Sequence, residues 1–360
     1  MGVKERRADV PIFCLDKSLP LAYYLRMFPS AKTSSFPTIQ DIWERYRPDL
    51  LKVEAQIQKN LSSEVPLINQ VAQYILNSGG KRIRPLLMIL SSKLCPSPGE
   101  DHILLAAVVE FIHTATLLHD DVIDEGNLRR GKKTVRTLWG NHASILVGDY
   151  LYATAVAHGL SLNNQEVNLV LQRACSQMIE GEMVQHAYNS DLEIAESDYL
   201  RIIQHKTASL IAASCHLGGI VSGGSSDQKK SLYQYGQNLG IAFQVADDTL
   251  DYIAQTQRLG KTLGADLREG KVTLPLIHLL RNCSYEEKKQ VTQTFGAGDS
   301  SEKQFDEILD LMHRHGSIEY AFSVARGYIQ KSAGYLESFD PSVHKAAMEV
   351  VADYVVSRDH

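Results

Sequence analysis

With 360 residues, of which 44% are hydrophobic and 22% are charged, the chain can bury a substantial core as one large domain. Its net charge of −5 and its lack of a long basic run argue against nucleic-acid binding. Its apolar runs fall short of the roughly 18 to 20 uncharged residues of a membrane span. We therefore expect a soluble protein that contacts a membrane at most peripherally.

The cysteines are scattered and lack the C-x-x-C spacing of zinc or redox sites. This pattern favours reduced thiols that serve in packing, and a cytoplasmic location. The residues are Cys14, Cys95, Cys175, Cys215 and Cys283.

Residues 1–38 mix basic with acidic side chains, which favours an irregular extension because a transit peptide should be acid-poor. Targeting to an organelle is the alternative. Over residues 39–360, apolar residues recur at three and four positions without sustained alternation, so we predict one all-α domain. The expected helices cover about 39–60, 64–77, 82–94, 101–124, 141–160, 164–188, 197–222, 228–254, 273–281, 302–313, 316–335 and 341–356.

The first polar cluster along the chain is GGKRIRP, residues 79–85. Lys81 and Arg84 lie three positions apart on one helix face, and the two glycines permit close backbone approach. This arrangement favours an anion site, with an ordinary helix start as the alternative. It is not a P-loop, because G-x-x-x-x-G-K-[ST] is missing.

Two acidic segments, 120–124 and 247–251, repeat the pattern D-D-x-x-D within long apolar helices. Helix spacing brings the three aspartates of each segment close together, so each would form a three-carboxylate claw. Such carboxylates repel one another unless cations neutralise them, and their oxygens suit Mg²⁺. A solvated helix end is the alternative for one copy, but the pair favours metal sites that hold a diphosphate. The carboxylates are Asp120, Asp121, Asp124, Asp247, Asp248 and Asp251.

A loop rich in glycine and basic residues follows each acidic segment. Arg129 and Arg130 stand in the first loop, and Lys261 stands in the second. Cations outside a metal shell can neutralise the remaining oxygens of a phosphate.

Polar residues also interrupt the apolar helices. His113 lies two turns before the first acidic segment on a similar face, where a satisfied core histidine is an equal alternative. Lys206 and Thr207 stand between apolar stretches, and a buried lysine needs a partner such as phosphate. Gln244 comes three positions before the second segment and can face the same site.

Together these residues resemble the trans-type (E) polyprenyl diphosphate synthases. The similarity spans about residues 40–355 and includes GGKRIRP, FIHTATLLHDDVIDEGNLRRG, LVGDYLYA, HKTASL, FQVADDTLDY and GKTLGADLREGKVTLP in the family's order. The resemblance implies an all-α barrel of long helices around a deep central cavity, the isoprenoid synthase type, built as a homodimer.

The resemblance also implies the reaction. Cations would stabilise the diphosphate that leaves an allylic substrate, and the double bond of isopentenyl diphosphate would attack the resulting carbocation. The departing diphosphate would accept the released proton, and an apolar cavity would exclude water.

Residue roles follow from the same resemblance. Catalysis would depend on Asp120, Asp121, Asp124, Asp247, Asp248 and Lys206, with two or three Mg²⁺ ions on Asp120, Asp124, Asp247 and Asp251. The allylic diphosphate would be bound by Arg129, Lys206, Thr207, Gln244 and Lys261. Isopentenyl diphosphate would be bound by Lys81, Arg84, His113 and Arg130.

In this family the residues four and five positions before the first aspartate control product length. Here they are Thr116 and Ala115, with Ile112 about one turn deeper, so no aromatic side chain stands at this level. The resemblance therefore predicts a long all-trans product of about C30 to C50, used as a quinone side chain. A farnesyl or geranylgeranyl product is the alternative if the small residues only admit a neighbouring helix.

Two other functions remain as alternatives. A terpene cyclase shares the first metal motif but typically has an N-S-E-like second one, and it needs no isopentenyl diphosphate site. A non-catalytic partner subunit of a heteromeric synthase would have degraded aspartate motifs. Two complete D-D-x-x-D segments and the GGK turn argue against both.

Overall fold

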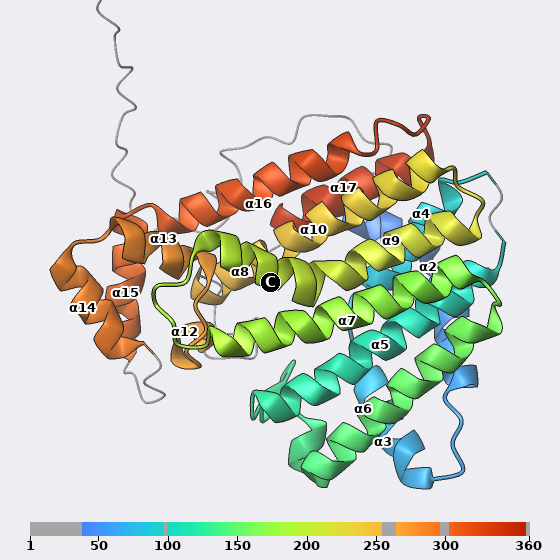
Figure 1. The fold of residues 1–360 in the computed structure, drawn as a ribbon, viewed down its shortest axis with the longest axis horizontal. Coiled ribbons are helices and arrows are strands. Elements are labelled where there is room, and N and C mark those ends of the chain that lie inside the picture. The colour runs from blue at the N-terminus through green and yellow to red at the C-terminus, as the bar shows by residue number, and fades with distance from the viewer. Residues whose placement is uncertain (1–37, 97–98, 254–263, 296–301, 358–360) are drawn as a thin grey trace, which may run out of the picture. The chain divides into compact units, whose positions relative to one another are not determined.

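The computed structural model describes residues 38–96, 99–253, 264–295 and 302–357, and most of these residues are helical (Figure 1). They belong to one compact unit, and the predicted all-α fold is confirmed. The elements are α2 (Ile39–Asn60), α3 (Pro66–Leu76), α4 (Ile83–Lys93), α5 (Asp101–Ile123), β1 (Leu128–Arg129), β2 (Lys132–Lys133), α6 (Val135–Ser161), α7 (Gln165–Ala187), α8 (Glu196–Ile203), the π-helix η1 (Gln204–Ala208), α9 (Ser209–Val221), α10 (Ser226–Ile253), α12 (Ala265–Arg268), α13 (Leu274–Asn282), α14 (Tyr285–Thr294), α15 (Glu302–Arg314), α16 (Ser317–Gly334) and α17 (Val343–Ser357).

Local capping explains where two of these helices begin. The side chain of Thr38 accepts a hydrogen bond from the N–H of Asp41, whose carboxylate accepts the N–H of Thr38 at 2.9 Å. This capping box begins α2 at its predicted position. Ser284 and Glu287 form the same box at the start of α14. The sequence prediction missed α14 although the S-x-x-E signal was present.

Helix α5 is a core helix. It packs along α6 and also contacts α2, α4 and α9. By length and composition alone its 23 residues could cross a membrane, but 72% of its most apolar window is buried by the rest of the fold. Burial of this helix holds the first acidic segment, at its C-terminal end, inside the protein.

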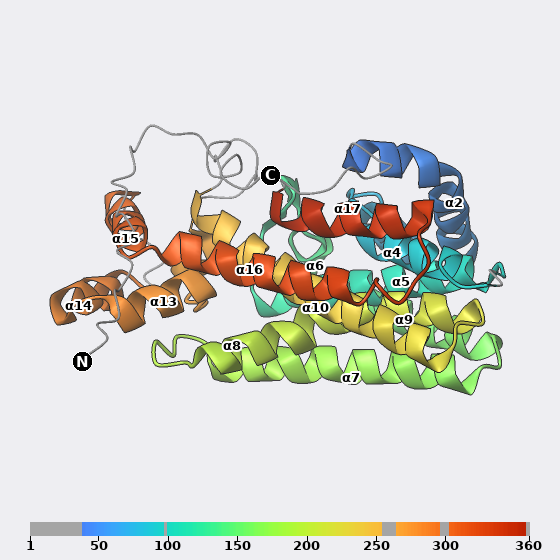
Figure 2. The same cartoon turned by 90° about the horizontal axis from the view of Figure 1, so that it is seen from above.

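Helix α10 carries the second acidic segment near its own C-terminal end. It packs against α9, α16, α17 and η1. Figure 2 shows α17 on one side of α10 and the pair α7 and α8 on the other, whereas α16 crosses in front of α10. The segment 247–251 is therefore surrounded by helices that can supply partners to its side chains.

The cysteines of the described residues pack within the fold as predicted. Cys95, Cys175 and Cys215 are free and buried, and Cys283 is free and partly buried. Cys14 lies outside the described residues.

Candidate active site

The first acidic segment directs its three carboxylates to different partners. Asp124 follows the last residue of α5, and its N–H donates to the carbonyl of Asp120 at 2.8 Å. Asp121 is only 3% exposed, and its Oδ1 accepts a 2.9 Å hydrogen bond from Nε of Arg129 and lies 2.9 Å from Nη2 of the same side chain. A guanidinium therefore engages the middle carboxylate of the predicted three-carboxylate claw. Asp120 and Asp124 remain the candidate metal ligands.

A two-residue turn after α5 aims two arginines in different directions. Arg130 (φ 52°) and Gly131 (φ 74°) connect β1 to β2, and their backbone angles suit a type I′ hairpin. Arg129 reaches back to the first acidic segment, whereas Arg130 lies against the GGK turn. A Cβ on Gly80 would come within 3.1 Å of Nη1 of Arg130, so glycine permits this approach.

Arg84, His113 and Arg130 form a cationic cluster beside the GGK turn. Burial lowers the pKa of Arg84, the carboxylate of Glu110 opposes this shift, and the charge of Arg130 adds to it. Burial and then the charges of Arg84 and Arg130 hold the pKa of His113 well below its usual value, which keeps the imidazole neutral. Nε of Arg84 is buried without a hydrogen-bond partner in the described part of the chain. An anion such as a diphosphate would supply the missing acceptor and negative charge.

The neighbours of Arg84 in the GGK turn have other partners. Lys81 is exposed, and its Nζ donates a 2.7 Å hydrogen bond to the hydroxyl of Tyr354 in α17. Arg82 (φ 45°) pairs with the buried Glu110 at 2.7 Å and donates to the carbonyl of Leu76 at 2.9 Å. Arg82 therefore anchors the turn that leads into α4.

The second acidic segment turns its middle carboxylate inward toward neutral partners. Asp248 is 8% exposed and accepts hydrogen bonds from the hydroxyl of Tyr199 at 2.6 Å and from Nε2 of Gln244 at 2.7 Å. Oε1 of Gln244 accepts in turn from Thr207 at 2.9 Å. Burial, together with the charge of Asp266, raises the pKa of Asp248 to about 8.

The outer aspartates of this segment are more accessible. Asp247 is exposed, and Asp251 is partly exposed. Oδ2 of Asp251 accepts the N–H of Asp266 at 3.0 Å, which ties α10 to the start of α12. Because Asp247 and Asp251 lie four positions apart on one helix face, they are the candidate metal ligands of this segment.

Lys206 and Thr207 project from η1, a π-helical turn where the sequence predicted one continuous helix over 197–222. Such turns within α-helices are frequent at functional sites. A Cβ on Gly181 of α7 would lie 2.6 Å from the backbone N of Lys206. A Cβ on Gly240 of α10 would lie 2.5 Å from Cα of Ala208. The two glycines thus allow η1 to fit between α7 and α10.

Lys206 also connects η1 to the first acidic segment. Its Nζ lies 2.5 Å from Oε2 of Glu182 in α7. Burial raises the pKa of Asp120 to about 6, opposed by the charge of Lys206 and aided by the charges of Glu182 and Asp124. Lys206 and Glu182 therefore lie beside Asp120, and Glu182 is a site residue that the sequence analysis missed.

Lys271 is a second site residue that the sequence analysis missed. Its Nζ lies 3.2 Å from Oδ2 of Asp124 and 3.0 Å from Oε2 of Glu269. Burial alone would lower the pKa of Lys271, but the carboxylates of Asp124, Asp266 and Glu269 raise it well above its usual value. The basic loop 260–271 contained the signal, but the resemblance to the family pointed to Lys261, which lies outside the described residues.

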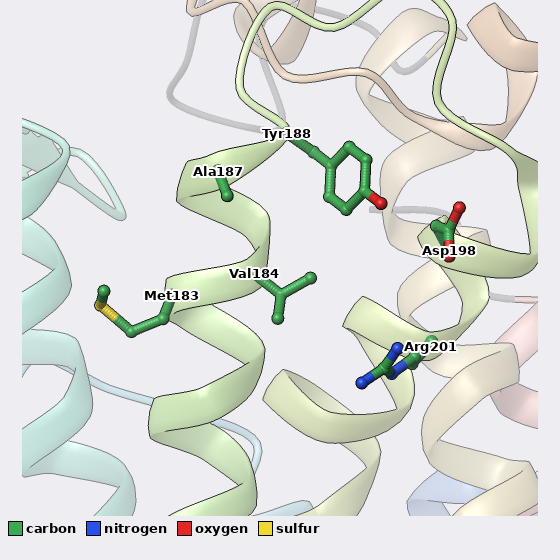
Figure 3. Close-up of a pocket in the computed structure, with 6 residues that line it drawn as sticks. All are labelled: Met183, Val184, Ala187, Tyr188, Asp198 and Arg201. Atoms are coloured by element: carbon green, nitrogen blue, oxygen red, sulfur yellow. The ribbon is translucent and has the colours of Figure 1, made fainter.

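Two cavities lie near these residues. One of about 140 Å³ adjoins the second acidic segment, and its walls include Lys206, Thr207, Gln244, Asp248 and Lys271. A larger one of about 410 Å³ opens between α7 and α8 (Figure 3). It is lined by Met183, Val184, Ala187, Tyr188, Asp198 and Arg201, none of which is a predicted site residue.

The predicted chain-length residues differ in exposure. Ile112 and Ala115 are 2% and 1% exposed, so both are packed in the core. Thr116 is partly exposed, and its hydroxyl donates to the carbonyl of His113 at 2.8 Å. Of the three, Thr116 is the side chain that a ligand can reach.

The carboxylate donors fit a divalent cation that is shared with a substrate. Within the described ranges, no three His, Cys, Asp or Glu side chains converge closely enough to hold an ion alone. Mg²⁺ is commonly bound through one or two carboxylates together with substrate phosphates. The pairs Asp120 with Asp124 and Asp247 with Asp251 suit that form of binding.

Comparisons with known proteins agree with this chemistry. Residues 65–312 match the family model described as polyprenyl synthetase. Octaprenyl diphosphate synthase of Haemophilus influenzae is 40% identical over 329 residues, which cover 91% of this chain and 100% of that protein. A polyprenyl synthase of Caulobacter crescentus, solved with calcium and isoprenyl diphosphate, gives a TM-score of 0.86 at 36% identity and covers 92% of this chain and 100% of that one. A decaprenyl diphosphate synthase of Rhodobacter capsulatus gives 0.85 at 37% identity and covers 89% and 99%.

Proposed function

The chain belongs to the polyprenyl synthetase family and is a prenyltransferase that makes long-chain polyprenyl diphosphates, and we propose that its two acidic segments and two cation clusters carry that reaction. The separation of the cations supports this assignment. Arg84 and Arg130 lie beside the GGK turn, whereas Lys206 and Lys271 lie beside the acidic segments. A condensation of two diphosphates requires two anion sites, but a cyclase requires only one.

Each cation cluster is assigned to one substrate. The cluster beside the GGK turn would bind isopentenyl diphosphate, and the cluster beside the acidic segments would bind the allylic diphosphate. The isopentenyl diphosphate residues are Lys81, Arg84, His113 and Arg130. The allylic diphosphate residues are Arg129, Lys206, Thr207 and Gln244, to which the geometry adds Lys271.

Two or three Mg²⁺ ions would be held by Asp120, Asp124, Asp247 and Asp251 together with the allylic diphosphate. When bound, they withdraw negative charge from the leaving diphosphate. Calcium in the Caulobacter crescentus structure supports a divalent-cation site in this family.

The protein's own residues then act on charge and position. Arg129, Lys206 and Lys271 stabilise the charge that develops on the departing diphosphate. Arg84 and Arg130 hold isopentenyl diphosphate so that its double bond attacks the allylic carbon as the C–O bond breaks. The departing diphosphate accepts the released proton, so no side-chain base is needed. The apolar core around α5 keeps water from the carbocation that forms when the allylic C–O bond breaks.

The product is proposed to contain about C30 to C50 and to serve as a quinone side chain, with a shorter C20 product as the alternative. Support comes from the small Thr116 one helical turn below Asp120. The octaprenyl and decaprenyl names of two similar proteins support the same range.

A homodimer is proposed as the working assembly. Eight large apolar side chains on α6 and α7 are between 41% and 65% exposed, and exposed apolar side chains that gather on a surface mark interaction sites. They are Leu138, Ile145, Leu146, Val156 and Leu160 on α6, and Leu169, Ile179 and Met183 on α7. We further propose a cytoplasmic location, with peripheral membrane contact to release the apolar product.

Product analysis tests the proposal. The purified protein would be given Mg²⁺, labelled isopentenyl diphosphate and farnesyl or geranylgeranyl diphosphate, and the product alcohols would be separated after dephosphorylation. A ladder that ends between about C30 and C50 is expected if the space below Thr116 stays open. A stop at C20 would support the short-chain alternative. No incorporation by the chain alone would support a cyclase or a partner-dependent subunit.

A further inference from the structure

Tyr354 of α17 lies against the lysine of the GGK turn. Nζ of Lys81 donates to its hydroxyl at 2.7 Å and lies 5.2 Å from the centroid of its ring. These two distances place the ammonium group beyond the hydroxyl, near the plane of the ring, so the hydrogen bond is the contact that holds it. The two residues are 273 positions apart, so the packing of the C-terminal helix creates this contact.

The hydroxyl of Tyr354 has unused hydrogen-bonding capacity. It accepts a hydrogen from Lys81, which leaves its own hydrogen to donate. No acceptor for that hydrogen and no carboxylate partner for Lys81 occur in the described part of the chain. Both groups are therefore positioned to donate to a further anion.

The same turn connects this pair to the cationic cluster. Gly80 precedes Lys81 and lies against the guanidinium of Arg130, where a Cβ would be 3.1 Å from Nη1. An anion held by Arg130 would lie next to the turn that carries Lys81.

We propose that Tyr354 is a member of the isopentenyl diphosphate site. Its hydroxyl orients the ammonium group of Lys81 and donates to a phosphate oxygen of the substrate. This inference rests on the proposed function, because it requires that Lys81 binds isopentenyl diphosphate. It makes the C-terminal helix a part of substrate binding.

Two substitutions separate the contributions of the hydroxyl and the ring. Tyr354→Phe keeps the ring and removes the hydroxyl, and it should raise KM for isopentenyl diphosphate about fivefold. Tyr354→Leu removes both and should raise it at least as much, because the hydroxyl carries the contact with Lys81. The value of kcat and the KM for the allylic diphosphate should stay unchanged in both variants. Partial retention of affinity by Phe distinguishes this role from simple packing.

Tyr46→Phe is the matched control. The hydroxyl of Tyr46 is 2.6 Å from Nδ1 of His344, so this change also removes a hydrogen bond to α17 but away from the GGK turn. Its KM for isopentenyl diphosphate should equal that of the unmodified protein. If Tyr354→Phe and Tyr46→Phe change melting temperature and both KM values alike, Tyr354 only supports the helix, and the inference is wrong.

Lys81→Met tests the underlying site separately. It should raise KM for isopentenyl diphosphate, and Tyr354→Phe should raise KM by a smaller factor in the Lys81→Met background than in the unmodified protein, because part of its effect acts through Lys81. An unchanged KM in Lys81→Met would contradict the proposed role of Lys81. A raised KM in Lys81→Met with an unchanged KM in Tyr354→Phe would contradict only the role of Tyr354.

Discussion

The two acidic segments share one sequence pattern but use their middle aspartates differently. Asp121 accepts a hydrogen bond from the guanidinium of Arg129 and forms an ion pair with it, whereas Asp248 accepts hydrogen bonds from the neutral Tyr199 and Gln244. One is a charge pair at the end of α5, and the other is part of a hydrogen-bonded chain inside the fold. A repeated motif therefore sets the spacing of carboxylates, while tertiary partners decide which of them stay available to a cation.

The two segments also differ in the side chain that lies one helical turn before each of them. Thr116 precedes the first aspartate of α5 by four positions, and Phe243 precedes the first aspartate of α10 by the same distance. A small side chain therefore stands below one segment, and an aromatic side chain stands below the other. We expect the growing product to extend along α5.

Removal of an outer aspartate should have the largest effect on the reaction. Asp120→Ala or Asp247→Ala should lower kcat about 1,000-fold, or about 4 kcal/mol, because each removes a proposed ligand of the cation that stabilises the leaving group. Incorporation of labelled isopentenyl diphosphate measures the loss. Asp101→Ala, an exposed change at the opposite end of α5, should retain activity. Near-normal turnover in either site variant would contradict the two-segment proposal.

Substitution of the middle aspartate should change the free energy of unfolding by different amounts in the two segments. Asp121→Asn should lower the free energy of unfolding by about 2 kcal/mol, because it leaves the guanidinium of Arg129 without its carboxylate partner. It should also raise KM for the allylic diphosphate, since Arg129 is no longer held in place. Asp248→Asn should cost less than about 1 kcal/mol, because an amide can still bond to Tyr199 and Gln244. Urea unfolding of both variants measures the contrast, and equal losses would contradict it.

Much of the fold could be predicted because helical periodicity and helix caps depend on residues that are close together in the sequence. The predicted bounds of α2 match the structure, and those of α5 differ by one residue at the C-terminal end. The hairpin of β1 and β2 was missed because two-residue strands are too short to show alternation. The π-turn η1 could not be foreseen, since it depends on the close approach of Gly181 and Gly240 from other helices.

The site could be predicted in part, because the spacing of its residues within one helix is also visible in the sequence. Spacing within one helix groups Asp120 with Asp124, but it cannot show that Arg129 engages the carboxylate between them. Lys271 and Glu182 acquire their places only when distant segments pack together. Local motifs therefore predict which residue types meet, and tertiary structure decides which atoms pair.

A bulky residue below the first segment should shorten the product. Thr116→Phe should end the ladder at about C20, because it places an aromatic ring one turn below Asp120. Thr116→Val, which keeps the side-chain size, should leave product length unchanged. Ala115→Phe should instead lower the melting temperature, because Ala115 is 1% exposed and leaves little room for a ring. Chromatography of the alcohols decides, and an unchanged ladder from a folded, active Thr116→Phe variant would contradict control of length by this residue.

The smallest effect is expected for a carboxylate that lies beside Lys206 and close to Asp120. Glu182 pairs with Lys206 and adds to the negative charge around Asp120. Glu182→Gln keeps an oxygen acceptor for Lys206 but removes the repulsion toward an incoming diphosphate. It should lower KM for the allylic substrate about threefold.

Glu180→Gln is the matched control for this change. Glu180 lies on the same helix, is 66% exposed at its side chain and sits 3.9 Å from His205, so its substitution should leave both KM values unchanged. A rise in allylic KM for Glu182→Gln would show that the charge of Glu182 holds Lys206 in place. In that case the position of Lys206 would depend on its charge pair with Glu182, in the way that the position of Arg129 depends on its charge pair with Asp121.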